Sequence, residues 1–158
     1  MSTSGVDAQL VNAFRSDDGM TVLRKMQSGD LPGPNVMRFF GVGLETVEDG
    51  HVVFTLEPSA KVYNMIGSVH GGVLSAVMDS ALGCSVQTQL PAGVFATTMD
   101  LHARFFRPVT VETGIVRADA RVIHRGRRSA TAECKLVDAA GKIHASCTST
   151  LMVLGAES

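Results

Sequence analysis

The chain has few residues of the kinds that mark several protein classes: no tryptophan, one tyrosine and three cysteines among 158 residues. Its acidic and basic side chains nearly balance, at a net charge of −1, which argues against a nucleic-acid-binding protein with its basic excess. The cysteines, Cys84, Cys134 and Cys147, are odd in number and form no C-x-x-C pair or metal-like spacing. They therefore predict neither a disulfide framework nor a zinc site, and favour a reducing compartment.

Long apolar runs are also missing. No stretch approaches the ~18 uninterrupted apolar residues of a membrane helix, and the N-terminus lacks the basic start and apolar core of a signal peptide. We therefore predict a cytoplasmic protein without membrane contact. The P-loop, G-x-G-x-x-G, G-x-S-x-G and H-E-x-x-H motifs are absent too, so nucleotide hydrolysis, dinucleotide redox chemistry, serine hydrolysis and zinc proteolysis lack their usual signatures.

The length suits one domain with a short extension. Residues 1–5 are small and polar, and we expect them to be frayed. Ser16, Asp17 and Asp18 are suited to capping and complementing a helix start, and Gly29 to ending that helix in a left-handed conformation. The sequence thus predicts an N-terminal helical extension over residues 1–35, followed by the main domain over residues 36–154.

The main domain alternates strand and helix signals. The apolar-rich stretches 36–47 and 51–56 flank the tight-turn dipeptide Asp49-Gly50, which predicts a hairpin. Residues 71–87 are rich in Ala, Leu and Met and predict a helix that is apolar on most sides and wrapped by protein. Further strands are expected at 94–107, 110–124, 128–137 and 142–154. The predicted fold class is α+β: a curved antiparallel sheet of five to six strands wrapped around one long central helix.

Asp79 is isolated within this helix. No other Asp, Glu, Lys or Arg occurs between Val62 and Met99. An ionised carboxylate removed from water costs several kcal/mol unless it is paired or hydrogen-bonded, so the isolated acid is a candidate for catalysis. The alternative is a buried acid hydrogen-bonded by the serine hydroxyls of Ser75 or Ser80.

Gly71 and Gly72 open the helix that carries Asp79. Free N–H groups at a helix start, together with the helix dipole, attract developing negative charge, as an oxyanion hole requires. The alternative is a glycine pair needed only for close packing of helix and sheet. Asp79 follows Gly72 by seven residues, which places it on nearly the same helix face, about 10 Å along the axis.

Three further polar positions lie close to this helix in sequence. His70 is a candidate general base or ligand, but a structural donor at the helix start is the favoured role. Asn64, on the loop before the helix, can orient a water molecule or a reacting carbonyl. Thr97 and Thr98 begin the next strand, and alternation alone does not decide which hydroxyl faces the helix.

Arginines are concentrated near one predicted turn, with five of the ten lying within twelve residues. Such a cluster is often a solvated hairpin tip. It can also bind phosphates, because guanidinium groups and turn amides match phosphate oxygens. The residues are Arg117, Arg121, Arg125, Arg127 and Arg128.

The spacing of His70-Gly71-Gly72 and Asp79, with Asn64 upstream and Phe105-Phe106-Arg107-Pro108 downstream, resembles the hotdog-fold acyl-CoA thioesterases of the phenylacetic-acid-pathway (PaaI-like) type. The resemblance covers roughly residues 36–154. It implies a homo-oligomer, a dimer or a dimer of dimers, with sheets paired edge to edge and active sites between subunits. It also implies hydrolysis of an acyl-CoA to a carboxylic acid and coenzyme A, without a metal or other cofactor.

The resemblance also implies roles for individual residues. Asp79 would be the nucleophile or general base, the Gly71 amide would polarise the thioester carbonyl, Asn64 would orient water or substrate, and His70 would support the loop. Thr97 or Thr98 resembles an assisting strand hydroxyl; in another branch a helix hydroxyl does this work, at the position of Gly83 here. The residues expected to contact substrate or coenzyme A are Gly72, Arg125, Gly126, Arg127, Arg128 and Ser129.

Three alternatives stay open at this point. A hotdog hydratase or dehydratase acting on enoyl or hydroxyacyl thioesters would use the same fold. A non-catalytic acyl-CoA-binding protein would bind without turnover. A structural oligomerisation module would bind no acyl-CoA at all.

Overall fold

Seven antiparallel strands form a single curved sheet in the computed structural model, which describes residues 8–155. The strand order is β1-β2-β5-β6-β7-β3, and β4 also pairs with β7. The expected fraying of residues 1–5 lies outside the described residues. The strands are β1 (Val42–Glu48), β2 (His51–Leu56), β3 (Phe95–Thr98), β4 (His102–Phe105), β5 (Val116–Arg125), β6 (Ser129–Val137) and β7 (Ile143–Leu154).

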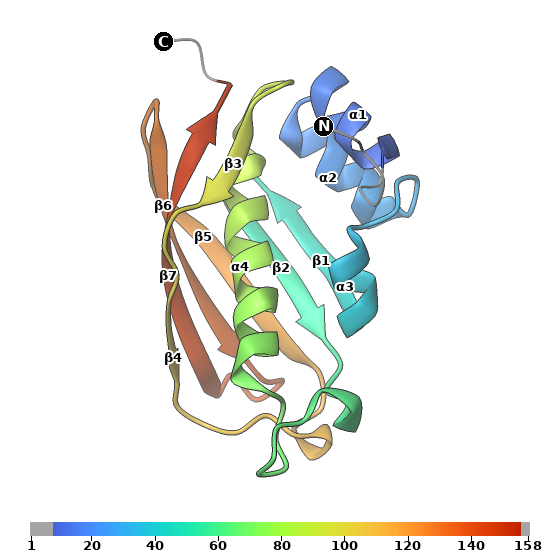
Figure 1. The fold of residues 1–158 in the computed structure, drawn as a ribbon, viewed down its shortest axis with the longest axis vertical. Helices are drawn as coiled ribbons and strands as arrows, with labels where there is room; N and C mark the ends of the chain where they lie inside the picture. The colour runs from blue at the N-terminus through green and yellow to red at the C-terminus, as the bar shows by residue number, and fades with distance from the viewer. Residues whose placement is uncertain (1–7, 156–158) are drawn as a thin grey trace.

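The long helix α4 (Gly71–Gln87) lies across the concave face of this sheet (Figure 1). Its buried positions include Val77, Met78 and Leu82, which pack against strand residues such as Phe54 in one core. The prediction of a long helix wrapped by a sheet is therefore confirmed. No helix within residues 8–155 combines the length and the apolar content needed to cross a bilayer.

Three stretches differ from the sequence prediction. The strand expected over 36–47 begins only at Val42, because α3 (Asn35–Phe40) precedes it and ends at Gly41, whose φ is 70°. The strand expected over 110–124 begins at Val116, after a single 3₁₀ turn at Val111–Thr113. The stretch 94–107 divides into β3 and β4, which brings the strand number to seven. Apolar content alone does not separate a short amphipathic helix from a strand.

The N-terminal helices pack against the sheet and the end of α4. Helix α1 (Ala8–Ser16) is followed by α2 (Gly19–Ser28), whose start is capped by the Asp18 carboxylate and whose end is Gly29 in the left-handed region, as predicted. Val22 and Leu23 of α2 are completely buried. The approach is close, since a Cβ placed on Gly19 would lie 1.8 Å from the Gln87 carbonyl oxygen.

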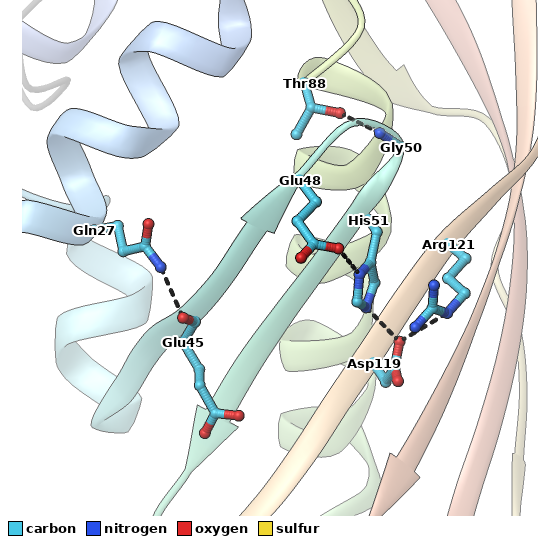
Figure 2. Close-up of polar contacts among 8 residues, drawn as sticks. All are labelled: Gln27, Glu45, Glu48, Gly50, His51, Thr88, Asp119 and Arg121. Atoms are coloured by element: carbon cyan, nitrogen blue, oxygen red, sulfur yellow. Dashed lines mark hydrogen bonds and ion pairs between the residues drawn. The ribbon is translucent and has the colours of Figure 1, made fainter.

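The convex face of the sheet carries a polar network between the β1–β2 hairpin and β5 (Figure 2). The His51 ring lies between two carboxylates, 3.0 Å from Glu48 Oε2 and 2.9 Å from Asp119 Oδ1. Arg121 pairs with Asp119, and Arg117 of the same strand pairs with a β1 carboxylate. These two arginines of the cluster therefore form ion pairs on the surface of the sheet.

Candidate active site

The Asp79 carboxylate lies half-buried on α4 and is bound by a hydroxyl from the sheet. Thr98 Oγ1 donates a hydrogen bond of 2.7 Å to Asp79 Oδ1. Thr98 is paired with the buried Leu151, whereas Thr97 is paired with the exposed Met152 and belongs to the opposite face of the strand. The structure thus selects Thr98 as the hydroxyl beside the acid.

Asp79 has no cationic partner among residues 8–155. Burial first, and then the neighbouring Asp79 carboxylate, raise the pKa of Cys84 to about 12 and that of Cys147 to about 11. A carboxylate held by one hydroxyl and no cation keeps free lone pairs for a reacting group.

The two glycine amides at the start of α4 differ in their hydrogen bonding. His70 caps the helix, because its Nδ1 accepts a 2.9 Å hydrogen bond from the Gly72 amide. The Gly71 N–H makes no hydrogen bond within the described part of the chain. Gly71 is therefore the amide that can bind an oxyanion, while the Gly72 amide belongs to the cap, in which the His70 ring accepts a hydrogen bond and does not donate one as expected from the sequence.

Asn64 holds the loop that leads into α4. Its Oδ1 accepts from the amides of Ile66 and Ser68, and its Nδ2 donates to Ser68 Oγ. The tip of this loop presents two apolar side chains to solvent, with Met65 100% and Ile66 84% exposed. The Asn64 side chain is thus used by its own loop in this single chain.

A cavity of about 450 Å³ adjoins the free Gly71 amide. Phe105 is one of its walls, and its ring lies so close to Gly71 that an added Cβ would be 3.3 Å from Phe105 Cζ. Asn64, Leu74, Phe106 and the segment 107–109 also line it. The cavity is therefore mainly apolar, and Gly71, whose amide makes no hydrogen bond in the described chain, is among the residues that line it.

The cavity and Asp79 lie at different levels of the same helix. Gly71 and Asp79 are eight residues apart, which at ~1.5 Å per residue separates them by about 12 Å along the axis. An oxyanion donor and an attacking group must both lie about 3 Å from one reacting carbonyl. Gly71 and Asp79 of one chain therefore cannot act on the same carbonyl.

The other three arginines of the cluster lie at the turn between β5 and β6. The Gly126 amide donates to the Ser129 carbonyl and closes the turn, while Arg127 and Arg128 are exposed and form no ion pair within the described residues. Arg125 is exposed as well. Ser129 lies opposite Met152, the same β7 residue that pairs with Thr97 on its other side. In the sheet, only β7 therefore separates β6, which begins at this turn, from β3, which carries Thr98.

With this arrangement in place, a family model described as "Thioesterase superfamily" matches residues 66–145, just over half of the chain. The chain belongs to the thioesterase superfamily. The matched segment includes the Gly71 amide, Asp79 and Thr98. The hotdog fold expected from the sequence is confirmed.

Named relatives and solved structures agree with this membership. A 1,4-dihydroxy-2-naphthoyl-CoA hydrolase of Listeria monocytogenes is 26% identical over 103 residues, covering 65% of this chain and 82% of the relative. A proofreading thioesterase of Klebsiella pneumoniae is 26% identical over 115 residues, covering 73% and 82%. The crystal structure of a phenylacetic acid degradation-related protein from Ralstonia eutropha is 29% identical with a TM-score of 0.75, covering 82% and 98%. The chain is thus a thioester hydrolase.

Some features of the thioesterase site were not found from the sequence. Phe105 and Phe106 entered only as part of a motif, and nothing in the pattern placed a phenyl ring over Gly71. Within residues 8–155, no three His, Cys, Asp or Glu side chains gather where they could hold a metal ion. The expectation that the reaction needs no cofactor stays a prediction.

Proposed function

We propose that this thioesterase hydrolyses an acyl-CoA to the free carboxylic acid and coenzyme A. The observation that carries the proposal is the free Gly71 amide beside an apolar cavity, in a helix whose only charged side chain is the Asp79 carboxylate. The Listeria relative, by its name, acts on a coenzyme A thioester.

The active site in this proposal is assembled from two copies of the chain. One copy supplies Asp79 and the other supplies Gly71, because about 12 Å separates them within one helix. β3 and β4 both pair with β7 and form one edge of the sheet. This edge offers unpaired backbone groups to a second copy of the chain. Exposed apolar side chains, Met65 and Ile66, lie before the start of α4 and are available to the same contact.

In the proposed reaction, the thioester carbonyl oxygen accepts a hydrogen bond from the Gly71 N–H, which stabilises negative charge as the carbonyl is attacked. Asp79 of the other copy either attacks the carbonyl carbon or takes a proton from an attacking water. Thr98 holds the carboxylate in one orientation through its 2.7 Å hydrogen bond. When Asp79 attacks, the thiolate of coenzyme A leaves, and a water molecule then hydrolyses the acyl–aspartyl anhydride to release the carboxylic acid. When Asp79 acts as the base, the attacking water becomes part of the carboxylic acid, and the proton held by Asp79 passes to the departing thiolate.

The basic turn is proposed to bind the phosphates of coenzyme A. Arg125, Arg127 and Arg128 are exposed, and the amides of Gly126 and Ser129 belong to the same turn. Arginine forks bind phosphate oxygens in pairs. Arg117 and Arg121 are not included, because each is paired with a carboxylate on the convex face.

The test is free-thiol release across a panel of aliphatic and aromatic acyl-CoA substrates, with Asp79→Asn as the matched variant. We expect turnover by the natural chain and a loss of about 10²-fold to 10⁴-fold in the variant, because the amide keeps the shape but not the basicity. Near-normal turnover in the folded variant would contradict this role of Asp79.

The same purified protein distinguishes a thioesterase from the three alternative functions. A hydratase or dehydratase would add or remove water from an enoyl or hydroxyacyl thioester without releasing thiol. A non-catalytic binding protein would show a ligand-dependent rise in Tm without turnover, and a structural module would show neither.

A further inference from the structure

A buried histidine bridges two segments behind the wall of the Gly71 cavity. His144 of β7 is 5% exposed. Its Nδ1 lies 3.1 Å from the Pro108 carbonyl oxygen, and its Nε2 lies 3.1 Å from Asp138 Oδ2. A carbonyl oxygen and a carboxylate oxygen only accept hydrogen bonds, so both bonds form together when the ring carries both protons.

Asp138 is the fixed end of this bridge. Its Oδ1 accepts from the amides of Ala140 and Lys142, both at 2.9 Å, so the carboxylate is held by its own turn. The hydrogen bond from His144, and then those from Lys142 and Ala140, hold the pKa of Asp138 below its usual value. The carboxylate therefore stays charged and keeps the ring in place.

Pro108 is the other end, and it belongs to the cavity wall. Just beyond β4, the amides of Phe106 and Arg107 donate to the His144 carbonyl oxygen at 2.8 and 3.2 Å. Pro108 has no N–H with which to continue these bonds, and its carbonyl oxygen is bound by the His144 ring instead. The Val109 carbonyl oxygen then accepts from the amide of Val69, another residue of the cavity lining, at 2.8 Å.

We propose that His144 is a positioning residue for thioester hydrolysis: the hydrogen bond from its Nδ1 to the Pro108 carbonyl oxygen fixes the Pro108 wall at the distance from Gly71 that the substrate requires, and the bond to Asp138 orients the ring. This inference rests on the proposed function in one respect, namely that the cavity beside Gly71 receives the substrate. The side chain acts through Pro108 and does not touch the reacting atoms. Its loss therefore weakens substrate binding in the ground state and in the transition state alike.

Two substitutions of His144 test its hydrogen bonds to Pro108 and Asp138 one at a time. In His144→Asn the amide nitrogen takes the place of Nδ1 and can still donate to Pro108, whereas in His144→Gln it takes the place of Nε2 and can donate only to Asp138. For His144→Gln we expect KM to rise about tenfold with kcat within about twofold, the effect of one lost hydrogen bond on a uniformly bound group. For His144→Asn we expect KM within about twofold of the natural chain.

A measurement without substrate accompanies the kinetics. In ¹⁵N-labelled protein, the Val69 amide, which bonds Val109 next to Pro108, and the Gly71 amide, which lies against Phe105, report the wall position. We expect both resonances to shift in His144→Gln and to stay near their natural positions in His144→Asn. Absence of turnover in the natural chain would contradict the proposed function, while the resonances would still decide the role of His144.

The proposal is overturned if both variants change KM and the two resonances by the same amount and lose the same Tm. That pattern would mean that His144 contributes to the general stability of the fold and not to the position of Pro108. It is also overturned if neither variant changes them.

Discussion

Replacing Gly71 by proline removes the one hydrogen that the proposed mechanism needs from the backbone. Gly71 is the first residue of α4, where proline is well tolerated because its fixed φ suits the helix and its N–H is not required by the helix. His70 before it has φ −59° and ψ 133°, a conformation that a following proline permits. The substitution therefore deletes the donor while leaving the helix start intact.

The expected loss follows from the state of this amide. The Gly71 N–H has no partner in the described chain, so its whole donor capacity is available to the oxyanion. Removing one donor from an oxyanion hole costs about 10²-fold to 10³-fold in kcat. The control is Gly71→Ala, which keeps the N–H and adds the same Cβ, 3.3 Å from the Phe105 ring, that proline adds.

The assay is steady-state thiol release by both variants, with circular dichroism and Tm to establish folding. We expect kcat of Gly71→Pro to lie about 10²-fold below that of Gly71→Ala. Equal kcat values in the two folded variants would refute the assignment of Gly71 as the oxyanion donor.

Three other predictions test the packing and the charges around the site. Gly19→Ala should lower the free energy of unfolding by about 1–3 kcal/mol through overpacking, whereas Gly33→Ala, with its nearest atom 3.8 Å away, should have little effect in denaturant titrations; similar midpoints would contradict the close approach of α2 to α4. Since burial and then the nearby Asp79 carboxylate raise the pKa of Cys84, Asp79→Asn should lower that pKa and speed Cys84 alkylation at pH 9, measured by mass spectrometry; an unchanged rate would contradict the influence of Asp79 on this thiol. The lowered pKa of Asp138 means that its stabilisation is full above the unfolded value of about 3.9 and is lost as pH falls through the folded value. The Tm difference between the natural chain and Asp138→Asn should therefore shrink as the pH falls below about 4, and a difference that grows on acidification would contradict it.

The elements that the sequence predicted well were those with strong local signals. The helix over residues 71–87 and the turn at Asp49-Gly50 follow from composition and turn chemistry, and both are present. The helix over 35–40 was missed, because a short apolar run before Gly41 has the composition of a strand.

The site residues depended on information that is not local. Choosing Thr98 over Thr97 required the register of β3 on β7. The separate fates of the Gly71 and Gly72 amides required the orientation of the His70 ring. The bridge from Asp138 through His144 to Pro108 spans 36 residues between His144 and Pro108 and left no pattern in the sequence.

The central claim is that Asp79 of one copy and Gly71 of another form each active site. Asp79→Asn and Gly71→Pro chains with different affinity tags can be co-expressed and purified through both tags as mixed dimers. One of the two sites in a mixed dimer then combines a natural Asp79 with a natural Gly71, so we predict about half of the natural activity per dimer, far above either parent. Mixed dimers as inactive as both parent variants would contradict the shared site.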